Sequence, residues 1–260
     1  MSNLSSIHPD AIIGKNVKIS PFVTIEKDVV IGDDCWIGSG ACIMSGVRLG
    51  NNVKIFQGAI VGAIPQDLKF GGEESILEID DNTIIREYCT LNRGTKANFK
   101  TYIGKDCLIM AYVHVAHDCV ISDNCILANN VTLAGHIEVA PHVVIGGMTA
   151  VHQFVHIGEH AMVGGGSLVR KDVPPFVKAA REPLSYVGVN SIGLLRRGFT
   201  NDQINTIQDV YRVLFVKGNN NTQALKIIHE ELPNSDEKAK ILEFIQQSNR
   251  GLMRGFRKMS

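Results

Sequence analysis

Large aliphatic side chains recur at every sixth position through the first two thirds of the sequence. The series runs from Ile7 to Val61, resumes between Ile79 and Leu91, and continues without a gap from Ile103 to Val169. The residue four places after each aliphatic is small or β-branched in most units, and Gly or Asp often follows the aliphatic directly. We number each six-residue unit from its large aliphatic, so that the second restricted residue occupies position 5.

This period fits neither an α-helix of about 3.6 residues per turn nor a strand that alternates between two faces. It fits short strands joined by tight turns, with three units making one triangular coil of eighteen residues. Successive coils would stack through backbone hydrogen bonds about 4.8 Å apart, and the aliphatics would fill the axis. The pattern therefore predicts a parallel β-helix over residues 1–174.

Two segments interrupt the series and are predicted to leave the coil. Residues 63–75 read AIPQDLKFGGEES, and their proline and glycines indicate a projecting loop. The polar stretch 97–102 is predicted to bulge outward as well. Loops held on a rigid scaffold are common places for functional residues.

From residue 175 onward the period of six gives way to helical signals, which predict an α-helical appendage over residues 175–260. A short helix is expected over residues 192–197, stopped by Gly198. Three longer helices are expected to begin at polar capping residues, the first of which forms a capping box with Gln203: Thr200, Thr222 and Ser235.

Composition narrows the class of protein. The 26 basic and 26 acidic residues balance, so no nucleic-acid footprint is visible. The start of the sequence lacks the basic and apolar regions of a signal peptide, and the uncharged stretch 139–158 contains a proline and three histidines, which argues against a membrane span. We therefore expect a cytoplasmic protein. The six cysteines form no CxxC pair, and five of them occupy position 5, which predicts small buried side chains.

Seven of the nine histidines fall between residues 114 and 160. Because none occupies position 1 or 5, all seven are expected on the outside of the coil or at its corners. Their density favours one shared functional face over seven unrelated surface side chains. The eighteen-residue coil predicts that Gly135 stacks above His117, and that two other histidines stack on each other. The seven are His114, His117, His136, His142, His152, His156 and His160.

The segment HVAHDC places a possible base, His117, beside a glycine of the next coil. A neutral imidazole can remove a proton from a hydroxyl near pH 7, and the Gly135 N–H can stabilise an oxyanion. Such a pair suits acyl transfer without a serine or cysteine nucleophile. Asp118 would orient His117, although sequence neighbours often point apart, and both alternatives remain open.

Metal catalysis is the alternative use of these histidines. Some left-handed β-helix proteins are zinc carbonic anhydrases, which carry an HxxxxH pair. The spacing does not occur in any of the three closely spaced pairs: His114/His117, His152/His156 and His156/His160. We therefore expect no metal and no cofactor.

Eight motifs occur in an order that is specific to one family: QDLKFGGE, LNRGT, HVAHDC, ILANNVTLAGH, GGMTAVHQF, DVPPF, GVN and LLRRGF. Over nearly its whole length the chain resembles the UDP-N-acetylglucosamine O-acyltransferases of lipid A synthesis. The usual crossover rule would favour right-handed coils, whereas the resemblance implies a left-handed β-helix.

The resemblance implies transfer of a 3-hydroxyacyl chain from acyl carrier protein to the glucosamine 3-hydroxyl of UDP-N-acetylglucosamine. It also implies a homotrimer with active sites between adjacent β-helices. His117 would be the general base and the Gly135 N–H would form the oxyanion hole. Other matched residues would line the cleft (His114, His136, His152 and Gln153), contact the acceptor sugar (Asp67 and Lys69) or hold the nucleotide (Asn190, Arg196 and Arg197). Gly165 matches the position that limits acyl-chain length, which predicts acceptance of a long chain.

One departure and two rivals remain. Residues 181–186 lack the histidine that many relatives place before GVN, so the nucleotide contacts there are in doubt. The sister N-acyltransferase has an additional N-terminal uridine-binding domain, whereas this chain enters its repeat by Ile7. The other rival is a non-catalytic β-helix scaffold that binds nucleotide sugar or acyl carrier protein.

Overall fold

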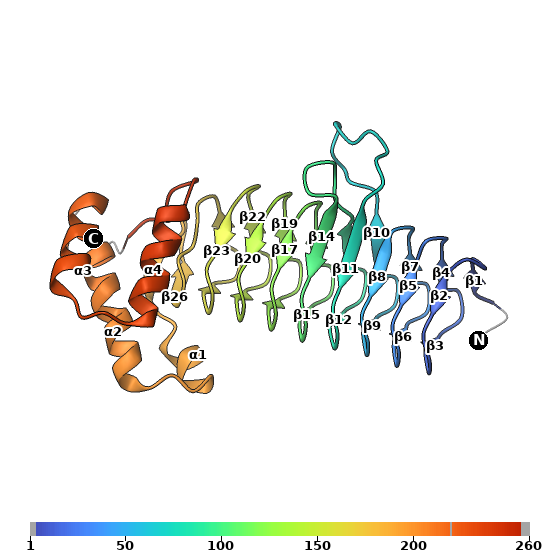
Figure 1. Cartoon of the computed structure of the whole chain (residues 1–260), viewed down its shortest axis with the longest axis horizontal. Helices are drawn as coiled ribbons and strands as arrows, with labels where there is room; N and C mark the ends of the chain where they lie inside the picture. Colours follow the sequence, from blue (N-terminus) through green and yellow to red (C-terminus); the bar gives the residue numbers. More distant parts are fainter. Residues whose placement is uncertain (1–3, 219, 256–260) are drawn as a thin grey trace.

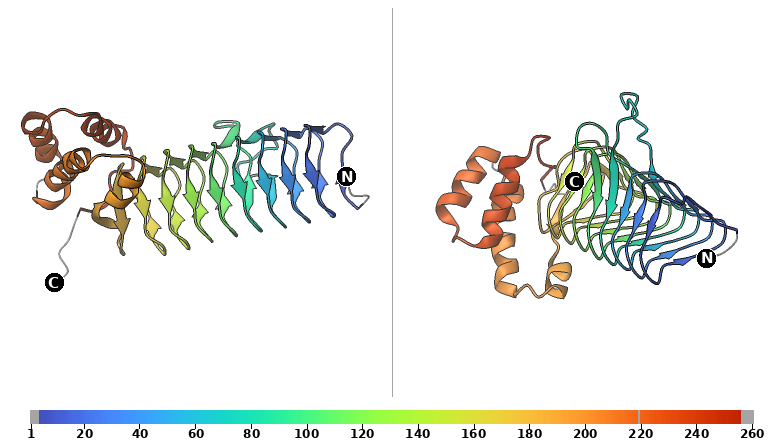
Figure 2. Two further views of the ribbon diagram at one scale, coloured as in Figure 1. Left: turned by 90° about the horizontal axis from the view of Figure 1, so that it is seen from below. Right: turned by 45° about the vertical axis from the view of Figure 1, so that its right-hand side comes forward.

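The computed structural model describes residues 4–218 and 220–255. It is a left-handed parallel β-helix, a prism of stacked coils with helices gathered at its C-terminal end (Figures 1 and 2), as the repeat and the resemblance predict. None of the helices in these ranges is both long enough and apolar enough to span a bilayer.

Each coil contributes one short strand to each of three sheets, so strands three apart in sequence are neighbours. The first sheet contains β1 Ser6–Ile7, β4 Thr24–Ile25, β7 Cys42–Ile43, β10 Ile60–Ala63, β13 Thr90–Asn92, β16 His114–Val115, β19 Thr132–Leu133, β22 Ala150–Val151 and β25 Leu168–Val169. The second contains β2 Ile12–Ile13, β5 Val30–Ile31, β8 Val47–Leu49, β11 Ile76–Ile79, β14 Lys100–Ile103, β17 Val120–Ile121, β20 Glu138–Val139 and β23 His156–Ile157. The third contains β3 Lys18–Ile19, β6 Trp36–Ile37, β9 Lys54–Ile55, β12 Ile84–Ile85, β15 Leu108–Ile109, β18 Ile126–Leu127, β21 Val144–Ile145, β24 Met162–Val163, β26 Val177–Ala180 and β27 Ser185–Val189.

The core is the axis of the prism. Position-1 aliphatics pair in register from coil to coil, as in Val115 with Leu133, and they are fully buried over most of the length. Position 5 is buried beside them, and it holds five of the cysteines as expected: Cys35, Cys89, Cys107, Cys119 and Cys125. Burial of this continuous apolar column stabilises each coil only when its neighbours are in place.

The corners of the prism turn through position 4, which adopts a left-handed conformation. Asp118 and His136 have φ of 58° and 60°. Asn and Asp tolerate this region better than most residues with a Cβ, and they occupy many of these corners. Side chains at positions 3 and 4 consequently stand outside the coil, where they can meet those of the next coil.

Two loops leave the β-helix between the first and second sheets (Figure 1). Residues 64–75 join β10 to β11, close to the prediction, and residues 93–99 join β13 to β14. The second prediction, 97–102, was wrong in its bounds, because Lys100, Thr101 and Tyr102 pair with β11. A search for aliphatic residues does not detect this strand, because the buried residue Thr101 is polar.

Helices α1 Ser191–Arg196, α2 Asn201–Tyr211, α3 Asn221–Glu231 and α4 Asp236–Gln247 follow, with a π-helical turn, η1 Arg212–Val216, after α2. The predicted capping box at Thr200 and the cap at Ser235 are confirmed. The cap at Thr222 is wrong, because the Asn220 side chain instead accepts the Gln223 N–H at 2.9 Å. Strands β26 and β27 precede these helices, so the third sheet continues past residue 174, where we expected the β-helix to end.

His142 and His160 stack at 4.7 Å between ring centroids, as the eighteen-residue register predicts. The column continues to Phe176, whose ring stacks on His160 at 5.8 Å, and Phe199 packs edge-on against the same imidazole. His160 lies outside the coil but is buried, and its Nδ1 has no hydrogen-bond partner in the described part of the chain. Burial, followed by the charges of His142, Arg197 and Lys240, lowers the pKa of His160 to about 4.

This buried imidazole should make the fold sensitive to acid. An unfolded histidine has a pKa of about 6.5. Between about pH 6.5 and 4, His160 is therefore protonated in the unfolded state but neutral in the folded state. His160 should therefore cost about 2 kcal/mol of stability at pH 5 relative to pH 7. Phe176, which stacks on His160, also has a positive φ, so a phenylalanine suits this kind of corner, and His160→Phe should flatten that part of the stability curve. Urea unfolding of both proteins at the two pH values tests this, and identical pH dependence would contradict it.

Candidate active site

His117 stands at the corner that follows β16, with its side chain outside the coil. Its Nδ1 lies 2.8 Å from Oδ2 of Asp118, so the structure brings together the two residues whose relation the sequence left open. The left-handed backbone at Asp118 turns the two side chains toward one another. Both residues are buried, although they stand outside the coil. The 93–99 loop covers Asp118, and Gly135 and the His136 ring lie against His117.

Asp118 is held as an anion. Its Oδ2 accepts the Thr95 hydroxyl at 2.6 Å, and its Oδ1 accepts the N–H groups of Thr95 at 3.1 Å and Asn98 at 3.3 Å. Burial alone would raise the pKa of Asp118, but the hydrogen bonds from Thr95 and His117 outweigh it and lower the pKa. An ionised carboxylate only accepts hydrogen bonds, so Nδ1 of His117 carries a proton, and in the neutral imidazole the lone pair is then on Nε2.

Gly135 lies on the coil above, beside the free edge of the His117 ring. A Cβ at residue 135 would stand 2.6 Å from Cε1 and 2.8 Å from Nε2 of His117, so only glycine leaves room for the imidazole. Within the described residues the Gly135 N–H has no hydrogen-bond acceptor. The stacking of Gly135 above His117 that the sequence predicts is confirmed, and it brings a residue with an unpaired backbone N–H next to the imidazole.

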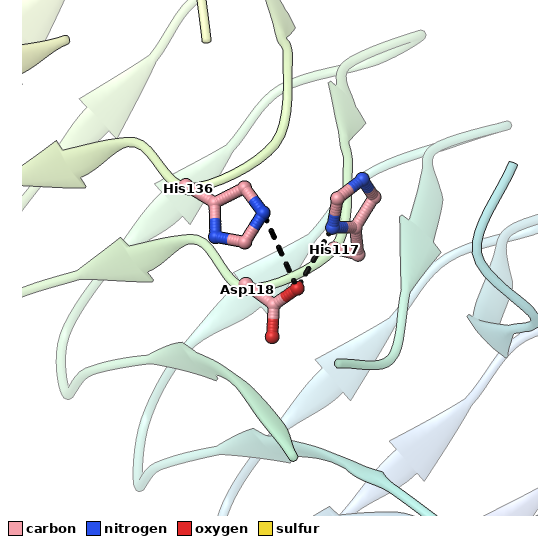
Figure 3. Close-up of side chains that lie close together, drawn as sticks. All are labelled: His117, Asp118 and His136. Atoms are coloured by element: carbon pink, nitrogen blue, oxygen red, sulfur yellow. Dashed lines mark hydrogen bonds and ion pairs between the residues drawn. The ribbon is translucent and has the colours of Figure 1, made fainter. Parts of the chain in front are cut away.

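His136 completes the cluster in Figure 3. Its Nε2 lies 3.8 Å from Oδ2 of Asp118, and its ring packs edge-on against His117 and stacks on Phe154. Burial lowers the pKa of His136, and the negative charges of Asp118 and Asp67 only partly oppose this effect. His136 is thus favoured as a neutral hydrogen-bonding side chain.

The other cleft candidates lie around this corner. His114 is on β16 itself, and its Nδ1 lies 2.8 Å from the Thr90 hydroxyl. Gln153 occupies position 3 one coil above Gly135. His152 precedes it and is exposed, and its Nδ1 lies 3.1 Å from a guanidinium nitrogen of Arg250.

The acceptor candidates Asp67 and Lys69 lie on the projecting loop. Asp67 accepts the Lys69 N–H at 3.0 Å, which shapes the loop tip, and the Lys69 side chain is exposed. The charge of Asp67 acts on His136, so the loop bends toward the histidine cluster. Leu68 between them is fully exposed.

The three nucleotide candidates stand elsewhere on the same chain. The Asn190 side chain is buried and donates to the His160 carbonyl at 3.0 Å. Arg196 is exposed, and Arg197 lies close enough to His142 and His160 that its charge adds to burial in lowering their pKa values. These histidines mark the corner between the second and third sheets, whereas His117 marks the corner between the first and second.

Gly165 follows β24 and is exposed. A Cβ at this position would approach the Gly147 carbonyl oxygen at 3.1 Å, which is tight but open to a small adjustment. Its φ lies outside the left-handed region, so a larger side chain meets no backbone strain there.

The donor set of the cluster could also hold a cation. One donor atom each from His117, Asp118 and His136 lie within 4.8 Å of one another, and two imidazoles with one carboxylate would suit zinc. Against that use, both Asp118 oxygens already accept hydrogen bonds from Thr95, Asn98 and His117. The expectation of metal-free chemistry stays a prediction.

Sequence reasoning missed Thr95, Asn98 and Arg250. Thr95 and Asn98 lie in a loop without periodicity, and only the coordinates place them on Asp118. Thr95 is the last residue of the LNRGT motif, and this membership is the one signal that could have indicated it.

Comparisons with known proteins agree with this architecture. A family model described as UDP N-acetylglucosamine O-acyltransferase, domain 2, matches residues 172–253, and a bacterial transferase hexapeptide model matches residues 28–63 and 100–135. An acyl-[acyl-carrier-protein]--UDP-N-acetylglucosamine O-acyltransferase of Thiobacillus denitrificans is 40% identical over 258 residues, covering 96% of this chain and all of the relative. The enzyme of the same name from Sulfurovum sp. is 44% identical, covering 96% of this chain and 98% of the relative.

Solved structures give the same result. A UDP-N-acetylglucosamine acyltransferase from Bacteroides fragilis superimposes with a TM-score of 0.96 at 47% identity, covering 98% of this chain and all of that chain. A homologous structure from Acinetobacter baumannii superimposes with a TM-score of 0.93 at 39% identity, covering 97% of this chain and 99% of the other. The chain therefore belongs to the UDP-N-acetylglucosamine O-acyltransferase family.

Proposed function

We propose that this chain transfers a 3-hydroxyacyl group from acyl carrier protein to the glucosamine 3-hydroxyl of UDP-N-acetylglucosamine, the first step of lipid A biosynthesis. The observation that carries the proposal is the pairing of His117, whose Nε2 is free, with Gly135, whose N–H is unpaired. The names of full-length relatives, which give donor and acceptor, support it.

The geometry supports a direct transfer. Nε2 of His117 removes the proton of the 3-hydroxyl while that oxygen attacks the thioester carbonyl. The Gly135 N–H stabilises the oxyanion that forms, and Asp118 stabilises the imidazolium. Collapse of this intermediate breaks the C–S bond, and the thiolate of the carrier protein takes the proton back from His117. No acyl-enzyme is required, and the cysteines at position 5 are buried inside the coil.

We propose further that the enzyme is a homotrimer with active sites between adjacent β-helices. Two features of the single chain support this arrangement. The nucleotide candidates Arg196 and Arg197 stand at a different corner from His117, so a second copy is needed to bring both sets to one substrate. Leu68 also exposes its whole side chain beside Asp67 and Lys69, as expected of a residue that packs against a neighbour. Light scattering should give the mass of three chains.

Gly165 should allow a long acyl chain, and Gly165→Met should shift the preferred donor toward shorter chains, because the thioether occupies the space beside this exposed turn. Gly165→Ala is the matched control, since its Cβ meets the same Gly147 oxygen without extending further. Competition between carrier proteins loaded with 3-hydroxyacyl chains of different length measures the preference. An unchanged preference in the Met variant would contradict the assignment.

The proposed activity is tested by incubating the wild-type chain with 3-hydroxyacyl carrier protein and UDP-N-acetylglucosamine, with and without a chelator. Transfer that survives chelation supports a metal-free O-acyltransferase, and loss under chelation would assign a metal to the His117, Asp118 and His136 donors. Binding of both substrates without transfer would favour a scaffold. Acylation of only a 3-amino acceptor would show that the chain uses a 3-amino sugar in place of the 3-hydroxyl acceptor.

A further inference from the structure

The 93–99 loop is bound on both sides. Toward the coil, Thr95 is buried, and its hydroxyl and N–H both donate to the Asp118 carboxylate. Toward the projecting loop, the Lys96 N–H donates to Oε1 of Glu73 at 2.9 Å, while Oε2 of Glu73 accepts the Gly71 N–H at 2.7 Å. Ser75 adds a bond from its hydroxyl to the Gly94 carbonyl.

Asp118 depends on these contacts for its orientation. Its own N–H donates to the buried Thr101 hydroxyl at 2.8 Å, which fixes the backbone, and Thr95 fixes the carboxylate. If the Asp118 carboxylate could rotate, the hydrogen bond from Nδ1 of His117 would no longer have a fixed acceptor. The imidazole would then be held neither in one tautomer nor in one orientation relative to Gly135. The Thr95 hydroxyl is the only side-chain donor other than imidazole that the described residues offer to this carboxylate.

We propose that Thr95 is a positioning residue for the general base, and that Glu73 couples it to the acceptor-binding loop. Thr95 holds Asp118, which holds His117, while Glu73 holds the Thr95 loop against the segment that carries Asp67 and Lys69. The loop that contacts the sugar and the residue that aims the base therefore share one chain of hydrogen bonds. This inference rests on the proposed function.

The main test replaces the hydroxyl without changing the volume. Thr95→Val should lower kcat by about 10- to 100-fold with KM changed little, because the base is misaligned while the substrate pocket persists. Without the Thr95 hydroxyl donor, the Asp118 carboxylate keeps more negative charge on the oxygen that accepts from His117, and this stabilises the protonated imidazole. The acid limb of the kcat/KM profile should consequently move to higher pH by about half a unit. Thr95→Ser, which keeps the hydroxyl, should recover activity to within about threefold.

Thr83→Val is the matched control. Thr83 is also buried, its hydroxyl donates to the Gly104 carbonyl at 2.7 Å, and it accepts the Cys107 N–H at 3.1 Å, so the same bonds are lost at a remote corner. It should lower the thermal midpoint about as much as Thr95→Val and leave kcat and the pH profile unchanged. Equal loss of kcat in both variants, or wild-type kinetics in Thr95→Val, would overturn the inference.

A double-mutant cycle tests the coupling through Glu73. Glu73→Ala should lower kcat/KM by about tenfold, and combining it with Thr95→Val should cost less than the product of the single losses, because both break the same link. Losses that multiply would show that Glu73 acts independently.

The positioning role also has a readout that needs no turnover. The His117 Nδ1–H proton should give a low-field NMR signal that is present in wild type and in Thr83→Val and is lost or shifted in Thr95→Val. If wild type transfers nothing but this signal behaves as expected, the proposed reaction fails while the positioning role stands. An identical signal in all three proteins would reject the positioning role even if transfer is observed.

Discussion

His117→Ala should lower kcat for acyl transfer by about 10³-fold, within the range that a general base contributes. In the described cluster, the His117 imidazole is the group whose free nitrogen lies beside Gly135. The substitution removes no position-1 or position-5 side chain, so the β-helix should stay folded. Steady-state kinetics with UDP-N-acetylglucosamine and the carrier-protein donor measure the loss, and circular dichroism checks the fold.

His156→Ala provides a matched control for this variant. His156 is also an outward histidine of the β-helix, but it lies on β23, where its Nε2 is 3.8 Å from Glu138 rather than near Asp118. Its removal should leave kcat within about twofold of wild type. Residual transfer by His117→Ala above about one tenth of wild type would assign the base to another residue.

Gly135→Ala should have the second largest effect, a loss of about 10²-fold in kcat. The new Cβ would lie 2.6 Å from Cε1 of His117, so the ring must move away from the acceptor hydroxyl. The backbone itself accepts alanine, because φ at Gly135 is not in the left-handed region, and the thermal midpoint should change little. Kinetics and thermal unfolding on the same preparation separate these two effects.

Gly147→Ala is the corresponding control. Gly147 also occupies position 3, and its Cβ would come closest to the Asn129 carbonyl oxygen, at 3.0 Å, with no atom of the His117 ring among its near neighbours. Transfer should therefore persist in this variant. Wild-type kcat in Gly135→Ala would mean that His117 does not act from the position seen here.

The periodic part of the fold could be predicted because one physical constraint repeats in every coil. Each coil must present an aliphatic side chain to the axis, and Val115 and Leu133 obey the same rule eighteen residues apart. The stacks of His117 under Gly135 and of His142 on His160 follow from counting alone. The His117–Asp118 contact did not follow, because it depends on the positive φ of Asp118 at the corner.

The segments without a period were predicted less well. Thr101 is buried at a position where the repeat predicts an apolar residue. Thr95 contacts Asp118 because of the conformation of its loop, which has no sequence period. Asn220 caps α3 in place of Thr222, since two polar residues near one helix start compete for the cap. Strands β26 and β27 extend the third sheet without a six-residue unit, because β27 returns antiparallel.

The register of the strands also limits how this protein can change length. The 64–75 and 93–99 loops leave the coil and return to it in register, so β10 pairs with β13 and β13 with β16 across both insertions. Insertions and deletions in these loops are therefore tolerated by the scaffold. An insertion or deletion inside the coil is not tolerated, because the loss of one six-residue unit would move every later residue to the next face of the prism. The separation between the His117 corner and the helical end can thus evolve only in whole coils, in steps of about 4.8 Å.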